Sequence, residues 1–246
     1  MTDTPAPDLK PSFRSDVTVD LVKHAASDSD VLWAARVSTA GEQSLEELQK
    51  DPERSKGLIN YLMRDRHGSP FEHNSMTFFI SAPIFVFREF MRHRVGWSYN
   101  EESGRYRELQ PVFYVPDAER KLVQQGRPGK YEFVAGSAEQ QELTSRVMED
   151  SYRRSYEAYQ EMLAAGVARE VARATLPVGL FSSMYATCNA RSLMHFLGLR
   201  TQHELAKVPS FPQREIEMVG EKMEREWAAL MPLTHAAFNT NGRVAP

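Results

Sequence analysis

Two long stretches with helical spacing of apolar residues set the first constraint on the fold. The first ends at Gly166, and its apolar face consists of Leu143, Val147, Tyr152, Tyr156, Tyr159 and Leu163. The second follows an expected capping box at Ser210 and Gln213, and its apolar line consists of Ile216, Val219, Met223, Trp227 and Leu230. Apolar residues three and four positions apart share one side of a helix, so each stretch must bury that side.

Other segments have the period of strands. Val17–Val22 and Met76–Ser81 alternate apolar and polar side chains, and Phe181–Thr187 is an apolar run of strand length. Strands and helices follow one another without a βαβ rhythm. We therefore predict an α+β fold, a single mixed domain with a mostly antiparallel sheet flanked by long helices.

Local signals predict several shorter helices. They are the run Val31–Val37, the residues around Leu58, Tyr61 and Leu62 with a stop at Gly68, a helix after Pro83 that breaks near Gly96, a short helix that ends at Thr175 before Pro177, and a helix capped by Asn189.

Two segments lack the features of a core. Residues 1–14 carry three prolines and little apolar content, so we expect a mobile N-terminal tail. Residues 117–140 are rich in glycine, so we expect an exposed excursion there. Residues 15–240 are then expected to form one domain.

Composition excludes several classes of protein. No apolar run approaches the ~18 residues of a membrane helix, and the beginning of the sequence lacks an apolar signal core, so we expect a cytoplasmic protein without a membrane partner. A formal net charge of −3 argues against a general nucleic-acid binder. The single cysteine, Cys188, excludes a disulfide framework. It lies in an apolar, strand-like run, so we expect a small core residue.

The densest polar stretch is residues 88–108, REFMRHRVGWSYNEESGRYRE, with five arginines, one histidine and four glutamates. The whole chain has 22 arginines and eight lysines, a ratio that codon usage could also produce. The planar fork of arginine grips phosphate or a heterocycle at two points, and lysine cannot. A loop of this composition suits a nucleotide. A solvated face of paired charges is the alternative, but the interleaved aromatic residues imply partial burial, and buried charges need partners.

Three other interpretations remain open from the residues alone. A metal enzyme would need His67, Glu72, His73 and His93 to converge, but the six-residue spacing of His67 and His73 does not place two ligands on one helical face, so we expect no metal. An RNA-binding module would use the arginine and aromatic side chains for phosphate contact and stacking. An interaction scaffold would use the two long helices.

One family is suggested by particular motifs. Arg92-His93-Arg94, eight intervening residues and Ser103 resemble the defining motif of flavin-dependent thymidylate synthases, with Trp97 as an additional residue of the spacer. Further segments resemble the family in its order, namely RVS at Arg36–Ser38, HGSPFEH at His67–His73, APIFVFREFMRHR at Ala82–Arg94, AREVARATLP at Ala168–Pro177 and NARSLMHFLGLR at Asn189–Arg200. The resemblance spans roughly residues 17–235.

The resemblance implies an activity and an assembly. Members of this family are homotetramers of an α+β fold whose active sites are built from several subunits. They convert dUMP to dTMP with FAD, NADPH and methylenetetrahydrofolate. The resemblance therefore implies a methyltransferase with one catalytic domain over residues 15–240, and no protein nucleophile is needed for the flavin route.

The resemblance also implies roles for individual residues. Those that match flavin contacts are His67, Ser69, Arg92, His93, Arg94, Glu101, Asn189, Arg191 and His195, with His67 and Ser69 supplied across a subunit boundary. Those that match dUMP contacts are Glu89, Arg92, Glu101, Glu102, Ser103, Gly104, Arg105, Arg173 and Arg200. Arg200 and Ser103 are the candidate catalytic residues, Arg200 to polarise the uracil ring and Ser103 to bind and polarise the substrate rather than to attack it.

Overall fold

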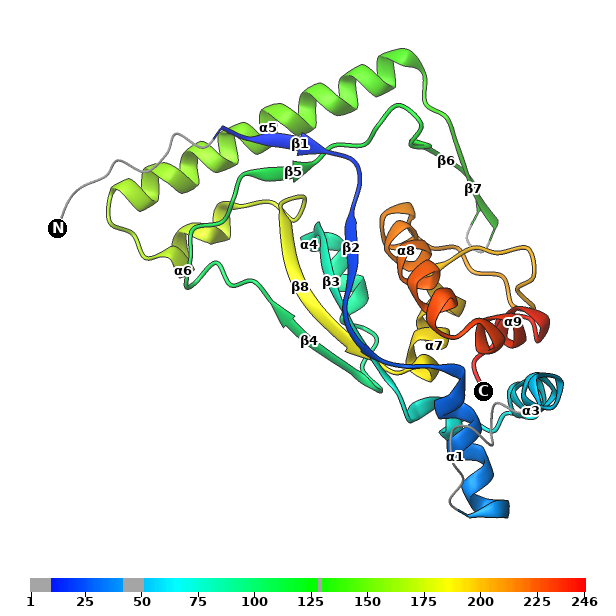
Figure 1. Cartoon of the computed structure of the whole chain (residues 1–246). Helices are drawn as coiled ribbons and strands as arrows, with labels where there is room; N and C mark the ends of the chain where they lie inside the picture. The colour runs from blue at the N-terminus through cyan, green and yellow to red at the C-terminus, as the bar shows by residue number, and fades with distance from the viewer. Residues whose placement is uncertain (1–9, 42–50, 128–129) are drawn as a thin grey trace. The chain divides into compact units, whose positions relative to one another are not determined.

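The computed structural model describes residues 10–41, 51–127 and 130–246 of the chain (Figure 1). Its contacts divide these residues into two compact units. The first contains residues 10–16, 82–85 and 102–182, and the second contains residues 17–41, 51–81, 86–101 and 183–246. No helix within the described ranges is long and apolar enough to cross a membrane.

The first unit is built around the long helix α5 (Ala138–Ala164), followed by α6 (Arg169–Ala172) and the 3-10 turn η2 (Arg173–Thr175). Two small sheets accompany these helices (Figure 1). Strand β1 (Ser12–Arg14) pairs in parallel with β5 (Val112–Tyr114), and β6 (Val123–Arg127) pairs antiparallel with β7 (Lys130–Val134). The core of this unit consists of Leu109, Phe113, Val115, Tyr152, Tyr156, Tyr159, Ala172 and Leu180.

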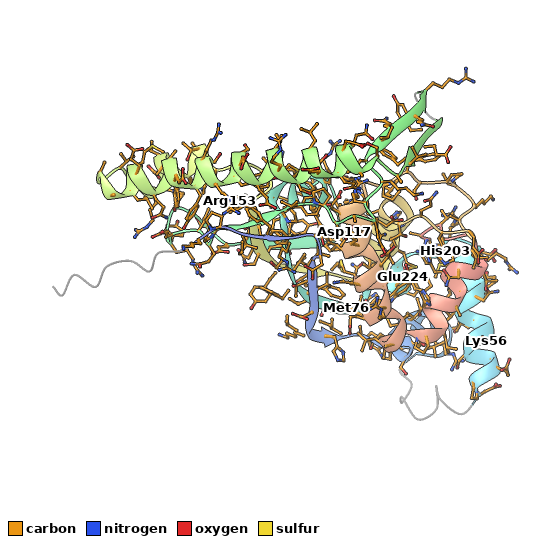
Figure 2. All side chains as sticks on the ribbon, turned by 90° about the horizontal axis from the view of Figure 1, so that it is seen from above. Lys56, Met76, Asp117, Arg153, His203 and Glu224 are labelled. Atoms are coloured by element: carbon orange, nitrogen blue, oxygen red, sulfur yellow. The ribbon has the colours of Figure 1, made fainter. Side chains whose placement is uncertain are left out.

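The second unit holds a four-stranded sheet in the order β2-β3-β8-β4. Strand β2 (Thr18–Ala25) pairs antiparallel with β3 (Ser75–Pro83), and β4 (Trp97–Glu101) pairs antiparallel with β8 (Phe181–Cys188). Alternate residues of β3 are buried because one face of the sheet forms the core. Met76 of β3 is fully buried, whereas Lys56 on a helix of the same unit is exposed (Figure 2).

Helix α8 is central to the helical part of the second unit, because it contacts α7, α9 and β2. The large apolar residues of its buried side are Ile216, Val219, Met223 and Trp227, which confirms most of the apolar line expected there. The helices of this unit are α1 (Asp28–Ala40), α3 (Pro52–Arg64), the short 3-10 helix η1 (Ser69–Glu72), residues 86–90 of α4 (Ile84–Phe90), α7 (Ala190–Arg200), α8 (Arg214–Leu230) and α9 (Pro232–Thr240).

The predicted α+β class is confirmed, and so are the three expected strands. Asn189 is the N-cap of α7, because its Oδ1 accepts a hydrogen bond from the Ser192 N–H at 2.8 Å. The excursion over residues 117–140 is largely exposed as expected, and it contains the β6–β7 hairpin, which the sequence did not indicate. Helix α9 was also missed.

The prediction of a mobile tail over residues 1–14 is wrong for its last part. Ser12–Arg14 forms strand β1, because the Ser12 N–H donates to the Pro111 carbonyl at 2.8 Å and the strand pairs with β5. A partner so distant in the sequence leaves no local signal. Residues 1–9 lie outside the described residues.

The stop of α3 also differs from the expectation at Gly68. The helix ends at Arg64, and Arg66 adopts the left-handed backbone with φ of 65°. The His67 N–H then donates to the Leu62 carbonyl at 2.9 Å, which closes the helix end. Arginine is rare in this conformation, so no local pattern predicts the turn. Gly68 has φ of −76° and precedes η1.

Two further expectations about the long helices need correction. Ser210 and Gln213 do not form a capping box, because α8 begins at Arg214 and the Ser210 hydroxyl donates instead to the Thr201 carbonyl. On α5 the buried tyrosines confirm half of the expected apolar face, but Leu143 and Val147 are 52% and 49% exposed.

The carboxylate of Asp28 connects α1 to the start of α9 and generates a stability prediction. It accepts hydrogen bonds from the Leu233 N–H at 2.8 Å, the Thr234 N–H at 2.9 Å and the Thr234 hydroxyl at 2.6 Å. We expect Asp28→Ala to lower the free energy of unfolding by about 1 kcal/mol, because first-turn donors of α9 lose their acceptor. Thermal denaturation should show a melting temperature lower by about 2–4 °C.

Asp20→Ala is the matched control, since Asp20 is an exposed aspartate on β2 of the same unit. Its melting temperature should stay close to that of the wild type. Equal losses in the two variants would contradict the assigned role of Asp28.

Candidate active site

The helix before the Arg92-His93-Arg94 segment is shorter than expected. Helix α4 ends at Phe90 instead of near Gly96, so Arg92 and His93 lie beyond it. The chain tightens there, because the His93 N–H donates to the Phe90 carbonyl at 3.0 Å, three residues back. The Tyr99 hydroxyl donates to the His93 carbonyl at 2.7 Å and so ties the segment to β4.

The residues after Gly96 also differ from the expectation. The sequence predicts a loop after the helix in residues 88–108, but Trp97–Glu101 is the regular strand β4, with Trp97 opposite Cys188. Cys188 is 2% exposed, and burial raises the pKa of its thiol. It is therefore the core residue that the sequence predicted.

The first turn of α7 holds the backbone just before β4 in place. The Ser192 hydroxyl donates to the Val95 carbonyl at 2.9 Å. Gly96 has φ of +70°, and a Cβ at this position would lie 2.1 Å from the Ser192 Oγ. Only glycine combines this backbone with this close approach.

The carboxyl end of α7 brings three predicted site residues together. Nη1 of Arg200 forms an ion pair with Oε2 of Glu89 at 2.8 Å, and Nε of Arg200 donates to Nε2 of His93 at 3.0 Å. Phe196, one turn earlier on α7, packs against the His93 ring with centroids 4.9 Å apart. The contact between Arg200 and Glu89 joins residues 111 positions apart.

The charges in this group are set by burial and by Arg200. Burial, followed by the charges of Arg200 and His195, lowers the pKa of His93 to about 4. His93 is therefore neutral at pH 7, and its Nε2 can accept the hydrogen bond from Arg200. Burial raises the pKa of Glu89 above its ordinary value. The charge of Arg200 opposes this shift, and the charge of Glu215 adds to it. The group can hold a cationic guanidinium beside a neutral imidazole.

A second group forms where α7 begins. A Cβ on Gly68 would lie 2.4 Å from Cζ of Arg191, so this guanidinium lies directly against the backbone between His67 and Ser69. Nη1 of Arg191 pairs with Oε1 of Glu72 at 2.5 Å. Three predicted flavin residues, His67, Ser69 and Arg191, thus occupy one place in the fold.

The second group contains the guanidiniums of Arg191 and Arg66 and the carboxylate of Glu72. Partial burial, then the charges of Arg191 and Arg66, lower the pKa of His195. Arg191 directs its Nε–H to a main-chain oxygen of Pro246, and Arg66 directs an Nη1–H to the Ala245 carbonyl, at 2.6 Å each. Guanidinium donors at a helix amino end beside a glycine are the groups that bind a diphosphate, so this site fits FAD.

Several of the residues predicted to contact the substrate form a third group, which belongs to the first unit. Gly104 is buried, and a Cβ there would lie 3.2 Å from Cδ of Arg173. The Ser103 hydroxyl accepts a hydrogen bond from the Arg105 N–H at 3.3 Å. Nε of Arg105 pairs with Oε2 of Glu170 at 3.1 Å. Two exposed guanidiniums therefore flank one glycine-containing turn, an arrangement that suits a phosphate.

The structure leaves some predicted residues outside these groups. Arg92, Arg94 and Glu101 are exposed, and Glu102 pairs with Arg107 at 3.1 Å. Sequence reasoning missed Arg66 as a site residue and considered Glu72 only as a metal ligand. The pairing of Glu72 with Arg191 spans 119 positions, so no local pattern could have indicated it.

These features define an α+β protein with basic, partly buried nucleotide-type sites and no reactive thiol. Residues 20–233 match the family described as "Thymidylate synthase complementing protein". The chain is 91% and 85% identical over 246 residues to the flavin-dependent thymidylate synthases of Streptomyces avermitilis and Streptomyces coelicolor, with all of each chain covered. The chain belongs to the flavin-dependent thymidylate synthase family.

Solved structures agree with this assignment. The UMP/dUMP methylase PolB from Streptomyces cacaoi, bound with 5-Br UMP, superposes with a TM-score of 0.88 at 56% identity, covering 96% of this chain and 99% of that one. Its complex with 5-Br dUMP gives a TM-score of 0.89, also at 56% identity, over 95% and 99% of the two chains.

The lowered pKa of His93 generates a prediction about acid stability. Folded His93 stays neutral down to about pH 4, whereas the unfolded chain protonates it near pH 6.5. The unfolded state therefore binds more protons between these values, and the stabilising contribution of this group is lost as the pH falls from about 6.5 to about 4. We expect His93→Gln to show a smaller drop in melting temperature between pH 7 and pH 5 than the wild type, measured at equal flavin content.

His24→Gln is the control, because His24 is an exposed histidine on β2. Its drop in melting temperature should match that of the wild type. An unchanged drop in His93→Gln would show that His93 is not held neutral by the fold.

Proposed function

We propose that the chain catalyses the reductive methylation of dUMP to dTMP, with methylenetetrahydrofolate as carbon donor and FAD reduced by NADPH as hydride donor. The observation that carries the proposal is the placement of Arg200 beside Glu89 and neutral His93 at the end of α7. Full-length relatives named for this activity support it. The solved relative PolB is bound with 5-Br UMP in one structure and with 5-Br dUMP in the other.

Arg200 is proposed to stabilise negative charge on the N3 side of the uracil ring. A planar guanidinium can direct two N–H groups to one edge of a heterocycle, and its charge raises electron density at C5, which receives the one-carbon unit. Glu89 and His93 orient Arg200 through two of its nitrogens. This chemistry needs no protein thiol, which agrees with the buried Cys188.

The flavin residues are assigned by the same reasoning. We assign His67, Ser69, Asn189, Arg191 and His195 to FAD, because this basic group and the bare Gly68 backbone fit a diphosphate. The exposed Arg92 and Arg94, with His93 and Glu101, are assigned to the same cofactor from the motif. Bound and reduced, the flavin supplies the hydride. That His67 and Ser69 serve a neighbouring copy stays a prediction.

The first unit is proposed to supply contacts to the nucleotide. Arg105 and Arg173 suit the phosphate of dUMP, because both are exposed beside the buried Gly104. Ser103 is assigned to binding and polarising the substrate. Glu89, Arg92, Glu101 and Glu102 are assigned to dUMP from the motif. One catalytic domain over residues 15–240 and a cytoplasmic location also stay predictions.

Arg200→Lys tests the proposed function. Wild-type protein with FAD, NADPH, methylenetetrahydrofolate and dUMP should form dTMP, measured by chromatography. Arg200→Lys keeps the charge but loses the planar fork. We expect its kcat to fall on the order of 100-fold with flavin still bound, because one preorganised donor group is worth about 2.7–4 kcal/mol in the transition state.

Arg225→Lys is the matched control, since Arg225 is an exposed arginine on α8. It should turn over dUMP at the wild-type rate. Turnover by Arg200→Lys within about threefold of the wild type, under 1 kcal/mol, would remove Arg200 from the mechanism. Absence of dTMP from the wild type would contradict the proposed function itself.

We also propose that the protein is a homotetramer. Leu143 and Val147 leave part of the apolar face of α5 exposed, and a helix face of this kind is buried in many assemblies. Light scattering of a flavin-loaded, active sample should give a mass near four times 28.1 kDa. A monomeric mass from such a sample would contradict the proposal.

A further inference from the structure

The side chain of Arg200 lies at the end of a helix, where its own contacts fix it only weakly. It is the last residue of α7, and helix ends have carbonyl groups without partners inside the helix. Its side chain and that of Glu89 are 21% and 27% exposed. Ion pairs that water can reach hold a side chain only weakly. A further contact should therefore fix the carboxyl end of α7, in addition to the contacts of Arg200 with Glu89 and His93.

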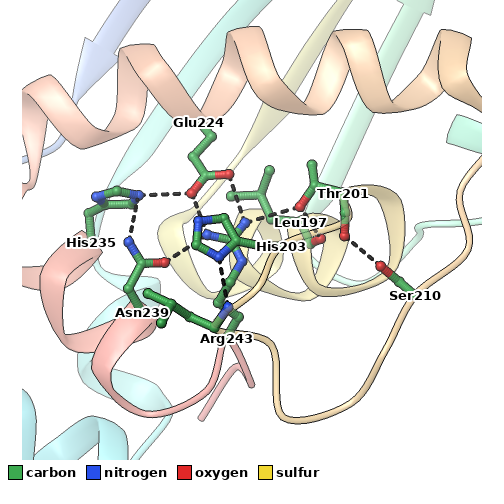
Figure 3. A network of polar contacts seen from close by, with 9 residues as sticks. Leu197, Thr201, His203, Ser210, Glu224, His235, Asn239 and Arg243 are labelled. Atoms are coloured by element: carbon green, nitrogen blue, oxygen red, sulfur yellow. Dashed lines mark hydrogen bonds and ion pairs between the residues drawn. The ribbon is translucent and has the colours of Figure 1, made fainter.

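Thr201, the next residue, is held from several directions (Figure 3). It is 4% exposed, and its Oγ1 donates to the Leu197 carbonyl at 2.8 Å and accepts from Nη2 of Arg243 at 3.0 Å. Its own carbonyl accepts a hydrogen bond from the Ser210 hydroxyl. A Cβ on Gly220 of α8 would lie 2.7 Å from Cγ2 of Thr201, so the backbone of α8 packs directly against it.

Arg243 is itself anchored to two other helices (Figure 3). Only 3% of it is exposed, and its Nη1 and Nη2 contact the two carboxylate oxygens of Glu224 on α8 at 2.6 and 2.7 Å. Nη1 also donates to Oδ1 of Asn239 on α9 at 2.7 Å. Burial alone would raise the pKa of Glu224, but hydrogen bonds from Arg243 and His235 lower it to about 2. Glu224 is therefore a carboxylate at pH 7, and its bidentate pair fixes the plane of the guanidinium.

The backbone of Arg243 is strained at this point. Its φ is 55°, in the left-handed region that residues other than glycine rarely adopt. Such strain persists only where the surroundings fix it, and it concentrates at functional sites. The Arg243 carbonyl also lies against α7, because a Cβ on Gly198 would be 3.1 Å from it. Arg243 thus contacts the last turn of α7 through both its side chain and its backbone.

We propose that Arg243 is a positioning residue for the reaction. Through Thr201 it holds the carboxyl end of α7, and thereby the guanidinium of Arg200, where Arg200 acts on the uracil ring. The proposal rests on the function proposed above for Arg200. A small displacement of a group that stabilises developing charge lowers the rate of the chemical step more than it weakens ground-state binding.

Thr201→Val and Thr201→Ser in the flavin-loaded, full-length protein test this proposal. Valine keeps the shape of threonine but removes the hydroxyl that contacts Arg243, and serine keeps that hydroxyl. We expect Thr201→Val to lower kcat for dTMP formation about tenfold. Its KM for dUMP, its flavin content and its rate of flavin reduction by NADPH without dUMP should stay within about twofold of the wild type. Thr201→Ser should recover kcat to within about threefold.

Two further variants make the test specific. Arg243→Lys keeps the charge but cannot contact Thr201 and both oxygens of Glu224, so it should lose kcat as Thr201→Val does. Thr144→Val on α5 is the matched control. The Thr144 hydroxyl donates to the carbonyl four residues back at 2.7 Å, as the Thr201 hydroxyl does, but this hydrogen bond is exposed to solvent. It should keep the kcat of the wild type.

The outcomes separate the two proposals. Normal kcat in Thr201→Val, with Arg200→Lys impaired, would overturn the role of Arg243 alone. Normal kcat in Arg200→Lys would overturn the proposed role of Arg200 and the positioning role with it. Equal losses in Thr201→Val and Thr201→Ser, or a parallel loss of flavin and of flavin reduction, would show general structural damage and would also overturn the positioning role.

Discussion

The packing of one side of α7 against the chain between Glu89 and Gly96 is the contact on which the candidate site depends. Ser192, Phe196 and Arg200 are spaced by four residues and so share a side of the helix. Phe196 is fully buried, with its ring centroid 4.5 Å from that of Phe90. The two polar residues hold the segment at its two ends. The Arg92-His93-Arg94 segment is therefore held against α7 by residues of one helix face.

This arrangement also separates two kinds of positive site along α7. Arg191 lies near the amino end of the helix, where the backbone dipole adds to its charge and favours an anion. Arg200 lies at the carboxyl end, beside an imidazole that burial keeps neutral. A neutral neighbour adds no repulsion to the guanidinium charge, which pairs with Glu89. The amino end therefore suits a diphosphate, and the carboxyl end suits a ring that develops negative charge.

The sequence predicted those parts of the fold that local patterns determine. The alternation in Met76–Ser81 and the cap at Asn189 are local, and both are confirmed. Strand β1 and the left-handed turn at Arg66 depend on distant pairing or on a rare backbone, and both were missed. The site residues came from a motif resemblance. Periodicity alone could not have paired Arg200 with Glu89 across 111 positions.

The preference for arginine over lysine has a structural reason at three positions of the second unit. Arg191, Arg200 and Arg243 each direct N–H groups from two different nitrogens to two different residues. A lysine ammonium on a flexible stem cannot fix two such directions in one plane. Lys222, in contrast, donates to a single carbonyl, that of Val17. Codon usage could raise the arginine content of the whole chain, but it does not explain why these arginines connect the two ends of α7 to the rest of its unit.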